Sequence, residues 1–215
     1  NIISFLNSAL KTKYNIKEEL IAFESKNSRF NNSMINYKGE LSINPFYLDL
    51  DIDLGQYEIS QLFNLNPILK EFIKTELLFN ENLSLDISIL AETKILDQIF
   101  QNAKINFNIV NGKLNLDNST FINNKIGLLK LDNSNLFVIN NELILNTDVL
   151  IKIKDSKPLF TLLNTNKKYR KNIKDILINL QYDFLSNEIE FNSVKIDNKE
   201  VSDQILNIIT GFKNN

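Results

Sequence analysis

Three carboxylates at alternate positions, Asp49, Asp51 and Asp53, form the arrangement in this sequence that comes nearest to a metal site. A calcium-binding EF-hand loop needs glycine at its sixth position and a bidentate glutamate at its twelfth. Counted from Asp49, those positions hold Leu54 and Ser60. The loop pattern is broken at both positions that fix its geometry, so we expect no calcium site here.

The residues around these acids predict a strand instead. Aliphatic side chains alternate with the aspartates and follow an aromatic residue: Phe46, Leu48, Leu50, Ile52 and Leu54. Strict alternation is typical of a half-buried strand. Side chains two residues apart on one face of a strand lie about 6–7 Å apart, too far for three carboxylates to converge on one ion. We therefore expect a strand over 45–54, with its acidic face in water and Phe46 on the apolar face.

The composition removes several classes of catalysis. The 215 residues include no His and no Cys. Without His, the usual general base, the commonest transition-metal ligand and the Ser-His-Asp triad are all missing. Without Cys, there is no thiolate nucleophile, disulfide or thiolate zinc site. No spacing among the 26 acidic residues singles out a glycosidase pair, and the five scattered glycines form no phosphate loop. We expect a protein that is not an enzyme and uses no cofactor or metal.

The densest group of positive charge is the stretch KKYRKNIK, residues 167–174, which contains no acid. Such a cluster could contact the phosphates of anionic lipids, worth about 1 kcal/mol per cation near a charged membrane, or could be a solvated turn. The net charge of -2 gives no general attraction to nucleic acid, so no nucleic-acid partner is expected. The candidate contacts to lipid head groups are Lys167, Lys168, Arg170 and Lys171.

The surrounding pattern predicts the elements that position these residues. Apolar residues at helical spacing predict an amphipathic helix over 1–12 and one or two helices within 59–79. Alternating residues predict strands over 16–25, 33–43 and 45–54, then a train of strands from 83 to 154 with a short helical connection over 93–103. Asn-rich pairs such as Asn111-Gly112, Asn123-Asn124 and Asn140-Asn141 favour tight hairpins between them.

The last third of the chain predicts a helix near 156–164, a hairpin of 175–184 with 187–197, and a terminal helix over 201–212. The tetrapeptide LDNS occurs at 116–119 and again at 131–134, a spacing that fits one strand plus one turn. Together these patterns predict a mainly β protein with a few short α-helices. Its core would be an elongated, curled antiparallel sheet, an open trough or half-barrel, with flanking helices.

An open trough would offer its apolar face to apolar ligands. The candidate groove residues are Ile105, Phe107, Ile109, Leu114, Leu116, Leu129, Leu131, Leu136, Val138, Leu143, Leu145, Val149, Ile151 and Ile153. The same face could instead be filled by the protein's own side chains, giving a non-catalytic structural or protein-interaction domain. A third alternative is a carbohydrate-active or other binding module on a β-sandwich, with two sheets packed about 10 Å apart.

Three stretches, taken in order, resemble the AsmA-like family, in particular the C-terminal region of its alphaproteobacterial members. They are YKGELSINPFYLDLDI (37–52), INFNIVNGKLNLDNSTFINNKIGLLKLDNSNL (105–136) and PLFTLLNTNKKYRKNIKDILINLQYDFLSNEIEFNSVKID (158–197). The family is similar to the wider group of repeating β-groove lipid-transfer proteins.

The resemblance implies a bacterial protein that is tethered to the inner membrane by an N-terminal helix and projects a β groove into the periplasm. It further implies phospholipid as partner, a role in outer-membrane biogenesis, and no catalytic residues. On this interpretation residues 1–215 are one β-groove segment, with strands and a helical insertion over 1–80 and a meander with short helices over 81–215. The sequence begins at Asn1 rather than Met, so we expect a longer protein whose membrane anchor lies outside this segment.

Overall fold

The computed structural model describes residues 2–5, 8–30, 33–57, 59, 79–93, 99–140 and 142–202. The helices predicted over 59–79 and 201–212 lie almost entirely outside these residues, as does half of the helical connection predicted over 93–103. Contacts divide the chain into two compact units, Asn1–Leu116 and Asp117–Asn215, which are described separately as unit 1 and unit 2.

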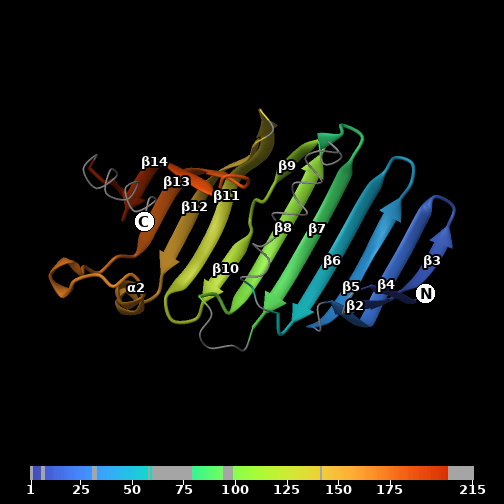
Figure 1. Ribbon diagram of the computed structural model, residues 1–215, viewed down its shortest axis with the longest axis horizontal. Helices are drawn as coiled ribbons and strands as arrows, with labels where there is room; N and C mark the ends of the chain where they lie inside the picture. The colour runs from blue at the N-terminus through green and yellow to red at the C-terminus, as the bar shows by residue number, and fades with distance from the viewer. Residues whose placement is uncertain are drawn as a thin grey trace. The chain divides into compact units, whose positions relative to one another are not determined.

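Unit 1 is a sheet in which strands follow one another in the order β1-β2-β4-β5-β6-β7-β8, with β3 also paired to β4 and β9 to β8. Figure 1 shows β4 to β8 running side by side. The bounds are β1 (Ile2–Phe5), β2 (Ser8–Lys11), β3 (Lys13–Lys17), β4 (Leu20–Phe30), β5 (Ser33–Ser42), β6 (Tyr47–Gly55), β7 (Ser84–Glu92), β8 (Asn102–Val110) and β9 (Lys113–Asn115).

The N-terminal helix predicted over 1–12 is wrong, because this segment forms the hairpin β1–β2, with Ile3 opposite Leu10. An isolated helix of about 12 residues is marginal in water, whereas the edge of β4 offers backbone partners to β2, where Ala9 pairs with Arg29. The strand predicted over 16–25 is likewise two strands, β3 and β4, joined by a turn at Glu18, whose φ is 50°.

One pair in unit 1 departs from the predicted antiparallel meander. Strands β6 and β7 are parallel, with Tyr47 opposite Ser84, whereas every other ladder in the unit is antiparallel. Parallel neighbours require a connection that returns along the length of the strand, and residues 56–83 separate β6 from β7 in the sequence. The alternation within each strand does not encode this direction.

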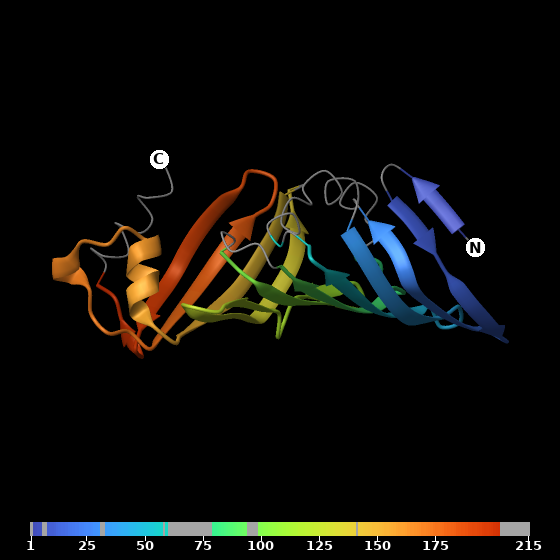
Figure 2. The same cartoon turned by 90° about the horizontal axis from the view of Figure 1, so that it is seen from below.

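Unit 2 is an antiparallel sheet in the order β10-β11-β12-β13-β14-β15, drawn from yellow-green to red in Figures 1 and 2. The connection between β12 and β13 carries the helix α2 (Ser156–Leu162) and the 3₁₀ turn η3 (Lys167–Tyr169). The strand bounds are β10 (Thr120–Asn123), β11 (Gly127–Ile139), β12 (Glu142–Ile153), β13 (Asp175–Asp183), β14 (Glu188–Ile196) and β15 (Lys199–Glu200).

Asparagine turns set the hairpins largely as predicted. Asn111 and Gly112 have φ of 50° and 70°, the pair of positive angles that a type I′ hairpin turn needs. Asn140 has φ of 51°, again as expected. Asn123 works differently, because its Oδ1 accepts hydrogen bonds from the N–H groups of Lys125 and Ile126, each at 2.9 Å.

The predicted fold class is confirmed. The chain is mainly β, its strands form large antiparallel ladders, and α2 is the one α-helix within the described residues. In neither unit do the described first and last strands pair with each other, so neither sheet closes. Each unit is one layer of strands rather than a two-sheet sandwich. Each layer therefore has two faces that other side chains or a ligand can cover.

Candidate functional site

The register of unit 1 separates one apolar face from one polar face. On β6, Ile52 lies opposite Tyr37 of β5 and Ile89 of β7, and Ile89 in turn lies opposite Ile105 of β8. Residues that lie directly opposite each other in a sheet share a face. The neighbouring row repeats the pattern, with Leu50, Ile87 and Phe107 in register. The apolar face therefore runs continuously across these strands.

The apolar face of β6 is only partly shielded from water. Leu48, Leu50 and Ile52 are half-buried, while Leu54 is buried. The three aspartates between them are exposed, which confirms the strand predicted for this stretch. Phe46, predicted to lie on the apolar face, is 42% exposed, because it belongs to the turn that precedes Tyr47 and not to the strand.

Four of the five groove candidates in unit 1 lie on this apolar face. Ile105 and Phe107 are half-buried, whereas Ile109 of β8 and its partner Leu114 of β9 are fully buried. Leu116 follows the end of β9 at Asn115, so strand register does not assign it to a face. Ile105 and Phe107 are thus the candidates in this unit that a ligand could touch.

In unit 2 all nine candidates share one face. Leu129 lies opposite Ile151 and Leu131 opposite Val149; beyond the bulge, Leu136 and Val138 lie opposite Leu145 and Leu143, and Ile153 lies opposite Gly127. Strand β13 extends these rows with Ile176 and Ile178, and β14 with Ile196 and Val194. Leu129, Leu131, Val138, Ile151 and Ile153 are half-buried, whereas Leu136, Leu143, Leu145 and Val149 are buried.

The face in unit 2 depends on a β-bulge between Asp132 and Asn135 of β11. Leu131 and Leu136 are five residues apart, so strict alternation would put them on opposite faces. The extra residue in the bulge returns them to the same face. The region from Gly127 to Ile139 is therefore one strand with a bulge.

The two LDNS copies build that bulge. Asp117 of the first copy accepts hydrogen bonds through Oδ1 from the N–H and the hydroxyl of Ser134 in the second, both at 2.6 Å. The Leu131 N–H donates to the carbonyl of Ser119 at 2.9 Å. Asn118 and Asn133, at equivalent places, have φ of 61° and 50°. The two copies of the repeat therefore bind each other at the bulge. Their spacing in the sequence did not indicate this contact.

The polar face of unit 1 carries a row of carboxylates that sequence reasoning missed. Glu40, Asp49 and Asp86 lie directly opposite one another on β5, β6 and β7. The pKa of Asp49 is raised above its ordinary value by burial first, then by Asp86, Asp51 and Glu40. These acids are far apart in the sequence, and only strand order brings them together.

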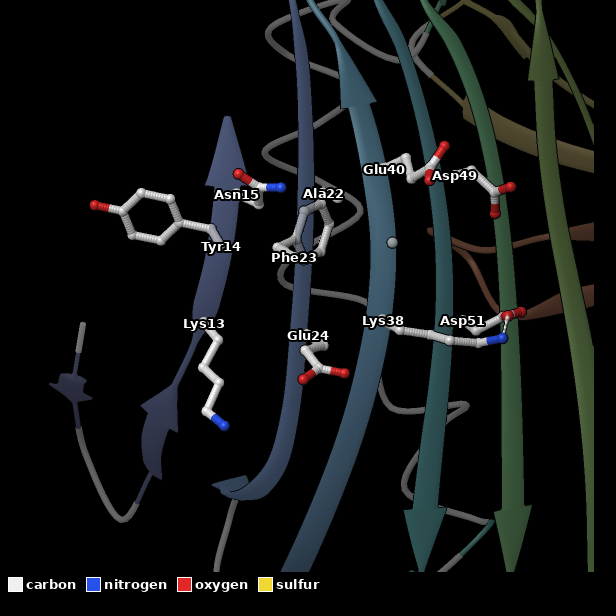
Figure 3. A pocket seen from close by; sticks show the side chains of 11 residues that line it. Lys13, Tyr14, Asn15, Ala22, Phe23, Glu24, Lys38, Glu40, Asp49 and Asp51 are labelled. Atoms are coloured by element: carbon white, nitrogen blue, oxygen red, sulfur yellow. Dashed lines mark ion pairs between the residues drawn. The ribbon is translucent and has the colours of Figure 1, made fainter. Parts of the chain in front are cut away.

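Part of this row borders a shallow hollow of about 520 Å³, shown in Figure 3. Lys38 reaches across it to Asp51, with Nζ 3.2 Å from Oδ2. Within the residues that the structure describes, no group of three or more potential ligands could hold a metal ion. The hollow is thus a charged surface on the face opposite to the groove candidates.

The four predicted head-group contacts all lie in the connection between α2 and β13, and all four are exposed. Asn166 caps η3 by accepting the Lys168 N–H at 3.2 Å, and Arg170 Nε donates to the carbonyl of Thr165 at 2.9 Å. Lys168 Nζ lies 4.7 Å from the centre of the Tyr169 ring. The positive charges are therefore gathered on a locally ordered turn.

Compared with known proteins, the sequence matches no family model and no curated protein. Within the described part of the chain, no helix has the length and apolar character needed to cross a bilayer. The AsmA-like resemblance therefore stays a hypothesis based on the three stretches quoted above.

Proposed function

We propose that this chain is an AsmA-like envelope segment that binds or transfers phospholipid through the apolar faces of its sheets, in outer-membrane biogenesis. The observation that carries the proposal is a single-layer sheet whose apolar face runs across several strands and stays half-exposed. The row Tyr37, Ile52, Ile89 and Ile105 is one example, and Leu129, Ile151, Ile176 and Ile196 is another.

A phospholipid that leaves a bilayer needs such an apolar face, because exposing its acyl chains to water costs a large free energy. Transfer of an acyl chain of about 15 methylenes into water costs about 12 kcal/mol, at about 0.8 kcal/mol per methylene. At 1.36 kcal/mol per factor of ten, that cost slows escape from a bilayer by about nine powers of ten. An apolar sheet face lowers the cost by replacing water around the chain. It needs no catalytic group, cofactor or metal to do so.

The half-buried side chains are the proposed contacts with acyl chains, and the buried ones support them from within the protein. On this division Phe107 and Ile151 contact lipid, whereas Ile109, Leu114 and Leu143 do not. The cellular setting follows from the family resemblance: the periplasm, with a tether to the inner membrane in the full-length protein.

Native mass spectrometry of protein purified from bacteria tests the proposal, since bound phospholipid adds a defined mass. Ile151→Asp places a charge on the apolar face, where an acyl chain would have to desolvate it, so lipid occupancy should fall several-fold. Lys152→Asp is the matched control, because it adds a carboxylate one residue away on the opposite, exposed face. Lipid-free wild-type protein, or equal occupancy in both variants, would contradict the proposal.

A second candidate is a non-catalytic structural or protein-interaction domain with a filled core. The observation that favours it is the start of β12, where Leu143, Ile144 and Leu145 are buried in succession on both faces of the sheet. On that account delipidation leaves the melting temperature unchanged. On the lipid account, removal of lipid lowers it, because a bound ligand stabilises the folded state.

A further inference from the structure

The connection between α2 and β13 exposes large apolar side chains. Leu162 is 50% exposed, Leu163 is 62% and Tyr169 is 64%. In both Figure 1 and Figure 2 this orange segment projects away from the strands of unit 2. Apolar side chains at such a projection gain nothing from the protein's own core, and three of them within residues 162–169 mark this segment as a candidate contact surface.

The backbone hydrogen bonds of the connection hold these side chains outward. Leu159 and Phe160 are the buried anchors of α2. Beyond them, the N–H of Leu163 donates to the carbonyl of Leu159 at 3.0 Å, and that of Thr165 to the carbonyl of Phe160 at 2.9 Å. Asn164 takes a positive φ of 48° and turns the chain. The exposure of Leu163 therefore follows from the fold of this segment.

Positively charged residues follow the exposed leucines in the sequence and flank Tyr169. No acid occurs from Ser156 to Lys174, and Lys167, Lys168, Arg170 and Lys171 are all exposed within it. A surface that combines Leu, Tyr and several cations fits one kind of partner in particular. Aliphatic and aromatic side chains enter the interface of a bilayer, while Lys and Arg contact anionic head groups.

We propose that residues 162–171, the docking loop, bind unit 2 to the surface of an anionic lipid bilayer. Leu162, Leu163 and Tyr169 enter the interfacial layer, and the four cations contact lipid phosphates. Two exposed leucines contribute nothing to a nucleic-acid contact, which favours the bilayer over RNA. The docking goes beyond the proposed function, because it does not require the sheet faces to bind acyl chains.

Vesicle sedimentation measures the docking directly, with phosphatidylcholine vesicles that contain or lack 30% phosphatidylglycerol. Each cation near an anionic surface contributes about a fivefold gain in partitioning at low salt. Replacement of Lys167, Lys168, Arg170 and Lys171 by Gln should therefore lower partitioning at least about a hundredfold and abolish its salt dependence. Leu162→Ser with Leu163→Ser should lower it about tenfold at every salt concentration.

A matched control removes the same charge elsewhere. Lys11, Lys13, Lys17 and Lys26 are four exposed lysines of unit 1, and their replacement by Gln should change partitioning less than threefold. An equal loss in this control would overturn the proposal, since only net charge would then matter. Because all substituted side chains are exposed, the melting temperatures of the variants should match that of the wild type.

A fluorescent reporter locates the contact, because the chain has no Trp. Tyr169→Trp should shift its emission to the blue on anionic vesicles and be quenched by brominated lipid. Tyr14→Trp is the control, as Tyr14 is 54% exposed on β3 of unit 1. No shift at position 169, an equal shift at both positions, or tighter binding to single-stranded RNA than to vesicles would overturn the proposal. The Ile151→Asp variant should partition onto vesicles as the wild type does. A failure of docking can therefore be told apart from a loss of lipid occupancy.

Discussion

The central strands of the two units, β6 and β12, are both long and both alternate in sequence, but they are buried differently. Along β6 exposed aspartates alternate with the half-buried Leu48, Leu50 and Ile52, and Leu54 near the end of the strand is buried. Along β12, Leu143, Ile144 and Leu145 are all buried, with exposed fractions of 0%, 6% and 7%. One end of β12 is therefore covered on both faces.

The comparison shows that the apolar face is open to solvent in one region and packed in the other. In unit 1 the face around Ile52 remains reachable from solvent, whereas in unit 2 the face around Leu143 is a packed core. Toward the other end of β12, Ile151 and Ile153 are again half-buried. Lipid contact is thus expected along β6–β8 and at the Ile151 end of β12, and not at Leu143.

The largest expected effect comes from a charge placed in each region. Leu143→Asp buries an unpaired carboxylate and should cost at least about 4 kcal/mol of unfolding free energy, enough to unfold unit 2. Ile52→Asp keeps its carboxylate partly hydrated and should cost about 1–2 kcal/mol. Urea unfolding monitored by circular dichroism measures both. Equal losses would remove the distinction between an open and a packed face.

A second contrast lies within unit 1, between two glycines. A Cβ at Gly39 would collide with the carbonyl oxygen of Asp49 and approach the Phe23 ring, whereas one at Gly55 would meet nothing within 4 Å. Gly39→Ala should lower the unfolding free energy by about 2–3 kcal/mol, since backbone atoms have to move. Gly55→Ala should be neutral or raise it by about 0.5 kcal/mol. A neutral Gly39→Ala would contradict the close approach of the Asp49 carbonyl to Gly39.

The smallest effects concern one carboxylate in each unit. Asp49 has a raised pKa, chiefly from burial and then from neighbouring acids, so its charged form destabilises the fold above that pKa. For Asp183 burial acts in the same direction, but hydrogen bonds from the Ser186 hydroxyl and from the N–H groups of Leu185 and Ser186 outweigh it and lower the pKa. Its charged form therefore stabilises the fold, and this stability is lost as pH falls through the lowered pKa.

At pH 7, Asp49→Asn should raise the unfolding free energy by about 0.5 kcal/mol and Asp183→Asn should lower it by about 1 kcal/mol. Both side chains reach water, which keeps the effects small. The gain from Asp49→Asn should shrink as pH falls through the raised pKa of Asp49. Thermal unfolding from pH 3 to pH 8 measures both trends, and effects of the same sign would refute the assignment.

Strand positions and faces could be predicted because period-two alternation is local. The stretch around Asp51 and the β12 candidates from Leu143 to Ile153 show this, since register places them as the alternation predicted, whereas Leu131 and Leu136 of β11 share a face only through the bulge. What depends on partners distant in sequence could not be predicted. The parallel pairing of β6 with β7, the acidic row of Glu40 with Asp86, and the conversion of the N-terminal segment to a hairpin all depend on which strand lies alongside.

The burial of individual side chains could not be predicted from the alternation of apolar and polar residues either. Leu143 and Ile151 occupy equivalent places in the same alternation, yet one is inaccessible and the other half-buried. The exposed Leu162 and Leu163 also follow helical spacing, which predicts an apolar stripe but not whether anything covers it. Only the packing around each residue distinguishes a core position from a contact surface.

Site-specific photocrosslinking tests the central claim most directly, because β6 presents its two faces at adjacent residues. A benzophenone amino acid placed in bacteria at Ile52 or Phe107 should crosslink to phospholipid, whereas one at Asp51, on the opposite face, should not. Leu143 should also give no lipid adduct, because it is inaccessible. Mass spectrometry of the adducts decides the outcome. Lipid adducts at Ile52 and Phe107 alone are the predicted result, and lipid at Asp51 in equal yield, or at none of these positions, would contradict it.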